Sequence, residues 1–182
     1  MTARIPPLDP PYPPALRAAL QAWMPSGTGA PPLGVHRTLA RHDDLSERLR
    51  ALGAFLLGHG RLPSRVRELL VLRTCARTGA ESEWGVHVTA FAEAIGLDDA
   101  TLAATVAPEP AGPDADLLRF ADELHDRATV SDATWAALAA RFEPEDLLEM
   151  LALVGFYHLI AFVENGAGVP REAWAARFPA TP

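Results

Sequence analysis

The chain has 182 residues, about half of them apolar, which is enough for one domain with a substantial core or for one domain and a tail. Its 16 basic residues are all arginines, and its 23 acidic residues leave a net charge of −7. Schiff-base chemistry and a Walker-type phosphate loop need a lysine, and a nucleic-acid-binding surface needs dense positive charge, so the composition argues against all three.

Cys75 is the single cysteine, so no internal disulfide, Cys-x-x-Cys redox pair or thiolate zinc site can form within the chain. The N-terminal segment MTARIPPLDPPYPP has no apolar run of the kind that a secretory signal contains. The longest apolar stretch, residues 147–163, includes Glu149 and His158, which is not typical of a membrane span. These features predict a cytoplasmic protein with neither a membrane nor a nucleic acid as partner.

Residues 1–34 form a proline-rich N-terminal arm, because they contain nine of the 17 prolines. Proline fixes φ and removes a backbone donor, so most of the arm should be extended or irregular. One short helix fits residues 14–23 and places Leu16, Leu20 and Trp23 on one side. The arm is either disordered or docked on the body or on a neighbouring subunit. Its large apolar side chains favour docking.

The pattern from about residue 38 onward is helical, and strand signals are nearly absent. Leucines recur at spacings of three and four up to Gly58–Gly60, and Ser64 is expected to cap the next helix. Further helices are predicted over residues 65–78, 81–95, 98–106, 114–128, 131–141 with Ser131 as cap, and 144–164, with a last turn or two in 170–178. The sequence thus predicts an all-α bundle in one domain, residues 35–182. The 144–164 helix should be central because it is apolar nearly all round.

Glu68, Glu83 and His87 are the candidate catalytic residues. Glu68 lies among apolar neighbours on one predicted helix, while Glu83 and His87 are four residues apart on one face of the next. A tight turn at Gly79 should bring the two helices together. Two carboxylates and an imidazole in an apolar setting can hold a proton near neutral pH, which general acid–base catalysis requires.

Two other interpretations of these residues stay open. Glu83 and His87 could be a simple ion pair on a solvated helix face. Carboxylate and imidazole could also bind a divalent metal, but the chain lacks the paired Glu-x-x-His motif of di-iron proteins, so no metal is expected.

Four further residues are candidates for the neighbourhood of the site. His158, on the central helix, could line the same cavity or be a hydrogen-bonded core residue. Trp84 could form a wall of the pocket or anchor the core. Arg73, with its neighbours on the same helix, could bind a substrate carboxylate, although ion pairs are the commoner use of such arginines. Cys75 is expected to fill the core.

The segment from Arg67 to Leu97 resembles the carboxymuconolactone decarboxylase and alkyl hydroperoxidase D-like superfamily. The resemblance is carried by RELLVLR at 67–73, GAESEWGVH at 79–87 and AIGL at 94–97, and extends over roughly residues 35–170 with ADELH at 121–125 and VGFYH at 154–158. It implies a helical bundle of the alkyl hydroperoxidase D-like type and a homo-oligomer, commonly a trimer or a hexamer. We therefore expect the N-terminal arm to cross a subunit boundary.

The peroxidase branch of this superfamily uses a Glu, a Cys-x-x-Cys pair and a His. When this sequence is matched to that pattern, Glu68 and His87 occupy the positions of the Glu and the His, but Ala80 and Glu83 occupy those of the two cysteines. A disulfide-cycling peroxidase needs those thiols, so peroxidase activity is disfavoured. The Glu-Trp-x-x-His version is similar to the decarboxylase-type branch.

Two functions from different classes follow. The first is a cofactor-independent carbon–carbon lyase or isomerase that acts on a small organic acid, lactone or carbonyl compound, with His87 or protonated Glu83 as proton donor and Glu68 as the group that orients His87. The second is a non-catalytic helical protein that binds a ligand or assembles through its surfaces. An open pocket touching at least two of the three candidate residues would favour the enzyme, whereas a sealed cluster would favour the second.

Overall fold

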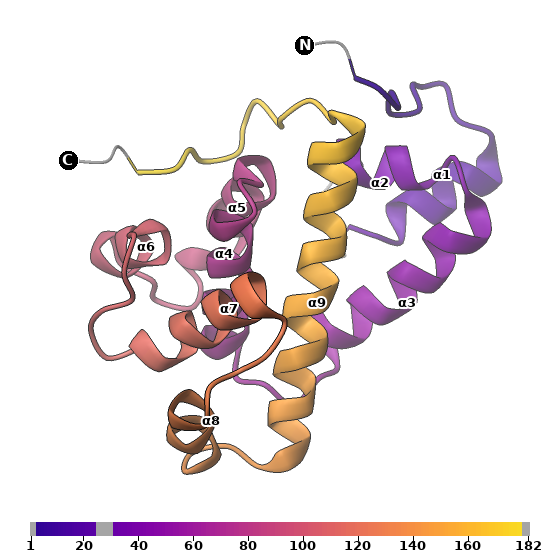
Figure 1. Ribbon diagram of the computed structural model, residues 1–182. Coiled ribbons are helices and arrows are strands. Elements are labelled where there is room, and N and C mark those ends of the chain that lie inside the picture. The colour runs from indigo at the N-terminus through magenta and orange to yellow at the C-terminus, as the bar shows by residue number, and fades with distance from the viewer. Residues whose placement is uncertain (1–2, 25–30, 180–182) are drawn as a thin grey trace.

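Two helices form the centre of the molecule in the computed structural model, which describes residues 3–24 and 31–179 (Figure 1). They are α4, Ser64–Arg77, and α9, Pro144–Ala167. The remaining elements are α1, Pro14–Gln21; α2, Gly34–Leu39; α3, Asp43–Gly58; α5, Glu81–His87; the π-helical turn η1, Val88–Ala92; α6, Asp99–Val106; α7, Ala115–Arg127; and α8, Asp132–Ala139. The predicted all-α class is confirmed.

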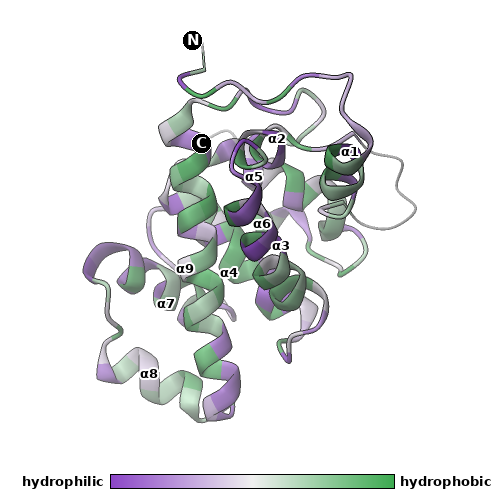
Figure 2. Ribbon diagram, turned by 90° about the vertical axis from the view of Figure 1, so that its right-hand side faces the viewer, coloured by the Kyte–Doolittle hydropathy of each residue, from purple (hydrophilic) through white to green (hydrophobic). Residues whose placement is uncertain are grey.

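Helix α4 is buried on nearly every side because Leu69, Leu70, Val71 and Leu72 follow one another without a polar residue. It packs against α5, α6, α7 and α9. Helix α9 is hydrophobic along most of its length (Figure 2). Burial of these side chains, each about 1.5–3 kcal/mol relative to exposure, stabilises the bundle and fixes the helix that carries Glu68.

Two helices begin at a residue whose side chain caps them, as the sequence indicates, whereas the cap expected for α4 is not observed. Ser131 and Asp98 each accept a hydrogen bond from the backbone N–H three residues later, at 3.3 and 2.8 Å. Ser64 does not cap α4, because Pro63 occupies the N-cap position and Ser64 is the first helical residue. At Gly79 the chain adopts a φ of 67°, which glycine permits without strain, and the chain passes directly from α4 into α5.

Three segments differ from the predictions. Helix α2 was not expected, because its six residues are too few to show a period. The predicted helix over 81–95 changes at Val88 into the π-helical η1. Helix α9 continues past Asn165 and Gly166 to Ala167 and ends at Gly168, whose φ is 66°.

The segment after α9 is not the predicted helical turn but a strap across α5. The backbone N–H groups of Glu172, Ala176 and Phe178 donate to side-chain oxygens of Ser82, Thr89 and Glu81, respectively. A side chain at Gly85 would collide with the Ala176 carbonyl, so only glycine allows the strap to pass this close to α5.

The described part of the N-terminal arm docks on the body of its own chain. The predicted short helix is present as α1, and its Leu20 is 1% exposed. Arg4 donates its backbone N–H to the Ala167 carbonyl at 2.7 Å, and Trp23 donates to Oγ of Ser46 at 3.3 Å. Residues 1–2 and 25–30 of the predicted arm lie outside the described residues. The oligomer and the crossing of a subunit boundary stay predictions.

Helix α9 is, within the described ranges, the helix long and apolar enough to cross a membrane by length and composition. Half of its most apolar stretch is buried inside the protein, as is usual for the central helix of a bundle. Leu148 and Phe162 are its large exposed apolar side chains.

Candidate functional site

Glu68, Glu83 and His87 meet where α4 and α5 pack together. His87 Nδ1 lies 2.6 Å from Oε2 of Glu68, and His87 Nε2 lies 3.5 Å from Oε1 of Glu83. The three residues are 1%, 6% and 3% exposed. The arrangement is therefore a buried proton-handling cluster rather than an ion pair on a solvated surface.

Two more side chains complete the contacts of this cluster. The Tyr157 hydroxyl, from α9, lies 2.9 Å from Nε2 of His87, and the Tyr157 ring is 2% exposed. Arg67 donates from Nε to Oε1 of Glu68 at 3.0 Å. His87 is thus held at both ring nitrogens, which fixes the orientation of its ring.

The electrostatics favour a charged His87 beside a charged Glu68. Burial alone would lower the pKa of His87, but the Glu68 carboxylate and hydrogen bonds with Glu68 and Glu83 raise it to about 10. Burial would likewise raise the pKa of Glu68, but His87 and then Arg67 lower it.

The contact with Tyr157 is compatible with both protonation states of His87. In the imidazolium, Nε2–H donates to the Tyr157 oxygen. In the neutral ring with Nδ1–H directed at Glu68, the Tyr157 hydroxyl donates to Nε2 instead. A proton can therefore leave and return at Nε2 without loss of either hydrogen bond.

Glu164, near the end of α9, is a buried carboxyl that the sequence analysis missed. It lies near the Ser82 hydroxyl and the Glu83 backbone N–H, at the start of α5, and both groups act to lower its pKa. Burial and the nearby Glu83 carboxylate raise its pKa to about 8, against the effect of those two groups. Its only signal in the sequence is an acidic residue at the end of an apolar helix, which usually marks the helix end.

His36, on α2, is the second residue that the sequence did not single out. Its ring stacks on the Trp23 indole with centroids 4.2 Å apart, and burial lowers its pKa to about 4, an effect that Glu83 opposes. No periodicity or motif surrounds His36, so the sequence contained no signal for it.

His158 does not belong to the cluster, which corrects one expectation. Its Nε2 lies 3.0 Å from Nδ1 of His125, and its Nδ1 lies 2.8 Å from the Val154 carbonyl. One residue along an α-helix turns the side chain by about 100°, so the preceding Tyr157 takes the place expected for His158.

The arginines of α4 do not provide a free cation for a substrate carboxylate, which corrects the expectation for Arg73. Its guanidinium forms two hydrogen bonds of 2.6 Å to Asp122 and two more to the carbonyls of Thr105 and Ala107. Arg65 pairs with Asp114, and Arg67 with Glu68.

Trp84 is a core anchor. It is 1% exposed, donates from Nε1 to Oγ1 of Thr105 at 3.0 Å, and packs edge-on against Phe178 of the C-terminal strap. Of the two roles expected for it, the contacts support the core role.

Cys75 should be chemically inert in the folded protein. It is fully buried, and burial raises the pKa of its thiol, with Glu83, Glu164 and Glu68 adding to the effect, so the reactive thiolate does not form. Titration with Ellman's reagent should detect no thiol in the native protein and one after denaturation. Rapid reaction of the native protein would contradict this assignment.

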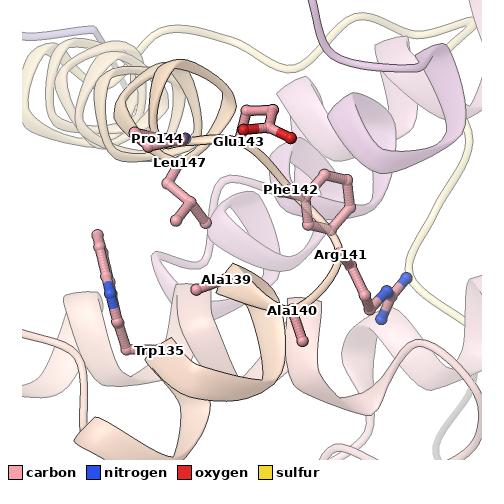
Figure 3. Close-up of a pocket in the computed structure, with 8 residues that line it drawn as sticks. All are labelled: Trp135, Ala139, Ala140, Arg141, Phe142, Glu143, Pro144 and Leu147. Atoms are coloured by element: carbon pink, nitrogen blue, oxygen red, sulfur yellow. The ribbon is translucent and has the colours of Figure 1, made fainter.

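Two surface pockets lie away from the cluster. One, of about 350 Å³, lies between α8 and the start of α9 (Figure 3), and its lining comprises Trp135, Ala139, Ala140, Arg141, Phe142, Glu143, Pro144 and Leu147. The other, of about 560 Å³, runs between α1 and α3 and is lined in part by Trp23 and Ser46. Neither touches Glu68, Glu83 or His87, so the expected open pocket beside two of them is not among these.

Residues 43–115, from α3 to the start of α7, match the model of the Carboxymuconolactone decarboxylase family. The match covers less than half of the chain. It contains Glu68, Glu83 and His87, whereas Tyr157, which contacts His87, lies on α9 outside the matched range. Among curated proteins, none matches the sequence.

Solved structures of a debrominase, of a peroxidase-related protein and of a protein of unknown function share the fold. An uncharacterized peroxidase-related protein from Silicibacter sp. TM1040 has a TM-score of 0.76 and 17% identity, covering 95% of this chain and 93% of that one. The debrominase Bmp8 in complex with 2,3,4-tribromopyrrole has a TM-score of 0.75 and 16% identity, over 96% and 94% of the two chains. A protein of unknown function from Agrobacterium tumefaciens has a TM-score of 0.65 and 18% identity, over 74% and 94%. At these identities the likeness establishes the alkyl hydroperoxidase D-like fold alone.

Residues 43–115 thus contribute Glu68, Glu83 and His87 to a buried cluster of titratable side chains. Nε2 of His87 contacts both Tyr157 and Glu83, and Oε2 of Glu83 has no hydrogen-bond partner among the described residues. Within the described ranges, no group of three or more His, Cys, Asp or Glu residues is placed to hold a metal ion.

Proposed function

We propose that the protein is an acid/base enzyme of the decarboxylase type, which moves a proton at a carbon atom next to a carbonyl group in a small organic acid, lactone or related compound. Decarboxylation and isomerisation share this step, because both pass through an enolate-like anion that must receive a proton at carbon. Proton transfer by a positioned side chain contributes roughly 10²- to 10⁴-fold to such reactions.

The observation that carries the proposal is the contrast between the two oxygens of Glu83. Oε1 lies 3.5 Å from His87 Nε2, whereas Oε2 is buried and has no hydrogen-bond partner among the described residues. A buried carboxylate with one oxygen turned to a proton carrier and the other unused is suited to exchange a proton with a substrate.

Each member of the cluster then has a distinct role. Glu83 exchanges the proton with the substrate carbon through Oε2, and His87 restores the protonation state of Glu83 from Nε2. Glu68 is a positioning residue, because its carboxylate stabilises the imidazolium form of His87 and orients the ring. Tyr157 keeps Nε2 hydrogen-bonded in both states of the ring.

The proposal predicts enzyme-catalysed exchange of carbon-bound hydrogen with solvent. A panel of lactones, ketones and oxo acids incubated with the protein in heavy water should include at least one member whose hydrogens next to the carbonyl are replaced by deuterium, as followed by NMR. His87→Ala and Glu83→Gln should each slow this exchange by about 10²-fold, because each interrupts the proton path.

His158→Ala is the matched control for this measurement, because His158 lies on α9 beside Tyr157 yet contacts His125 instead of the cluster. It should exchange at the wild-type rate. Absence of exchange across the panel, or exchange that persists in both His87→Ala and Glu83→Gln, would refute the proposal that the protein is an acid/base enzyme.

A non-catalytic binding or assembly protein is the second candidate, and one observation favours it. Glu68, Glu83 and His87 are all at least nine-tenths buried, and the two pockets described above do not reach them. Under this alternative, His87→Ala and Glu68→Gln would lower stability, and the exchange experiment would be negative for the wild type.

A further inference from the structure

Three buried polar atoms have no hydrogen-bond partner among the residues that the structure describes, and two of them belong to side chains of which one acts electrostatically on the other. These two are Oε2 of Glu83 and Nδ1 of His36, in side chains whose residues are 6% and 8% exposed. Leaving such an atom unpaired costs about 1–3 kcal/mol, and native proteins contain few of them. Two in one neighbourhood indicate a place for the polar atoms of another molecule.

The two atoms belong to one neighbourhood because the first turns of α2 and α5 are tied together. Glu172 accepts a hydrogen bond from the Gly34 backbone N–H at 2.7 Å and donates its own N–H to Oγ of Ser82 at 3.3 Å. Gly34 precedes His36 by two residues, and Ser82 precedes Glu83 by one. The Glu83 carboxylate is also the charge that acts on the His36 ring.

His36 is held as a neutral imidazole. Its ring is stacked on Trp23, with an angle of 20° between the planes, and burial lowers its pKa to about 4. A neutral imidazole carries one N–H donor. When the hydrogen is on Nδ1, that donor has no acceptor in the described protein and is available to a bound molecule.

The charges around this position disfavour an anionic ligand. The arginines of α4 nearest to Glu68 are each paired with a carboxylate, so they do not offer a cation to a second anion. A substrate carboxylate would therefore lie beside the Glu83 carboxylate, whose neighbouring cation, His87, is already shared with Glu68, and such a like-charge contact is costly in a buried site. An uncharged carbonyl compound avoids this cost.

We propose that His36 is a further catalytic residue, which donates a hydrogen bond from Nδ1 to the carbonyl oxygen of an uncharged lactone or ketone whose neighbouring C–H faces Oε2 of Glu83. The assignment rests on the acid/base function proposed above. The C–H bond breaks, its proton passes to Oε2, and the electron pair forms an enolate whose oxygen accepts the His36 hydrogen bond. Return of the proton to a carbon restores the carbonyl. A donor aimed at the oxygen where charge develops stabilises the transition state more than the ground state.

Binding of γ-butyrolactam tests this geometry without any reaction. Its ring N–H next to a C=O imitates the acidic C–H next to the substrate carbonyl. With carbon-labelled histidine rings, NMR titration should show a saturable shift of the His36 signal. N-methyl-γ-butyrolactam, which lacks the donor, and pyroglutamate, which adds a negative charge, should each bind at least tenfold more weakly.

His36→Gln should weaken lactam binding about tenfold or more, while the matched control His158→Gln should leave it unchanged. Circular dichroism establishes that both variants are folded, and the comparison of the two lactams on the wild type needs no variant. Equal affinity for the two lactams, tighter binding of pyroglutamate, an unchanged affinity in His36→Gln, or no saturable binding would each overturn the assignment.

The outcomes separate this inference from the proposed function. Lactam binding with the expected pattern, but no deuterium exchange on any carbonyl compound, would support the His36 binding site and reject the proposed enzymatic activity. Exchange that is lost in His87→Ala but unchanged in His36→Gln would support the enzyme and remove His36 from its mechanism.

Discussion

Replacement of Asp122 by alanine should destabilise the fold by about 3–5 kcal/mol, because it leaves the buried Arg73 guanidinium without its partner. Arg73 is 1% exposed, and its two hydrogen bonds to Asp122 are both 2.6 Å long. The ion pair joins α4 to α7, and the same guanidinium binds two carbonyls at the end of α6. Denaturant-induced unfolding, followed by circular dichroism, measures the loss.

Asp116→Ala is the matched control, since Asp116 also lies on α7 and also pairs with an arginine, Arg119, at 2.9 Å. Both of those side chains are substantially exposed, and exposed pairs contribute little, so the control should change stability by less than about 1 kcal/mol. If the two variants lost similar amounts of stability, the Arg73–Asp122 pair would not be the link between α4 and α7 that its burial indicates.

Glu164→Gln should stabilise the protein at pH 8 and have a much smaller effect, below about 1 kcal/mol, at pH 5. Glu164 titrates near its ordinary value of 4.5 in the unfolded chain, but at about 8 in the folded protein. Between these values the folded state holds one more proton, so stability falls as pH rises from about 4.5 to about 8. Glutamine has nearly the same shape but cannot ionise, so the variant avoids the loss.

The gain at pH 8 should be about 4 kcal/mol, given 1.36 kcal/mol for each unit between a pKa of 4.5 and one of about 8, with the folded group half ionised at that pH. Thermal unfolding of both proteins from pH 5 to pH 9 measures it. His87 also loses a stabilising proton as pH rises, between about 6.5 and about 10, but it does so in both proteins. Glu145→Gln, an exposed position on the same helix, should show no such dependence; an equal gain there would refute the assignment to Glu164.

The parts of the fold and of the site that the sequence predicted are those encoded by local spacing. Glu83 and His87 lie four residues apart on one helix, and the turn at Gly79 leaves the chain a short path back to Glu68. Ser131 caps its helix for the same reason, because the cap and its partner are three residues apart.

What the sequence did not predict depends on contacts between distant segments. Helix α9 is apolar nearly all round, so no period distinguishes the face that carries Tyr157 from the face that carries His158. The partner of Arg73 lies 49 residues further along the chain, and no local pattern identifies it. His36 comes to the site from α2, a helix too short to show a period.

The π-helical turn η1 directly follows His87. It makes the directions of the side chains after it independent of the directions set by α5. A π turn holds more residues than an α turn. The side chains beyond η1 therefore no longer follow the regular steps of about 100° per residue that α5 sets. Ala92 and Leu97 are buried in the core, while His87 faces Glu68. An uninterrupted α-helix would give these three side chains one fixed set of angles. Because η1 breaks this regular spacing, the core residues beyond it can change during evolution without a change in the direction of the His87 side chain.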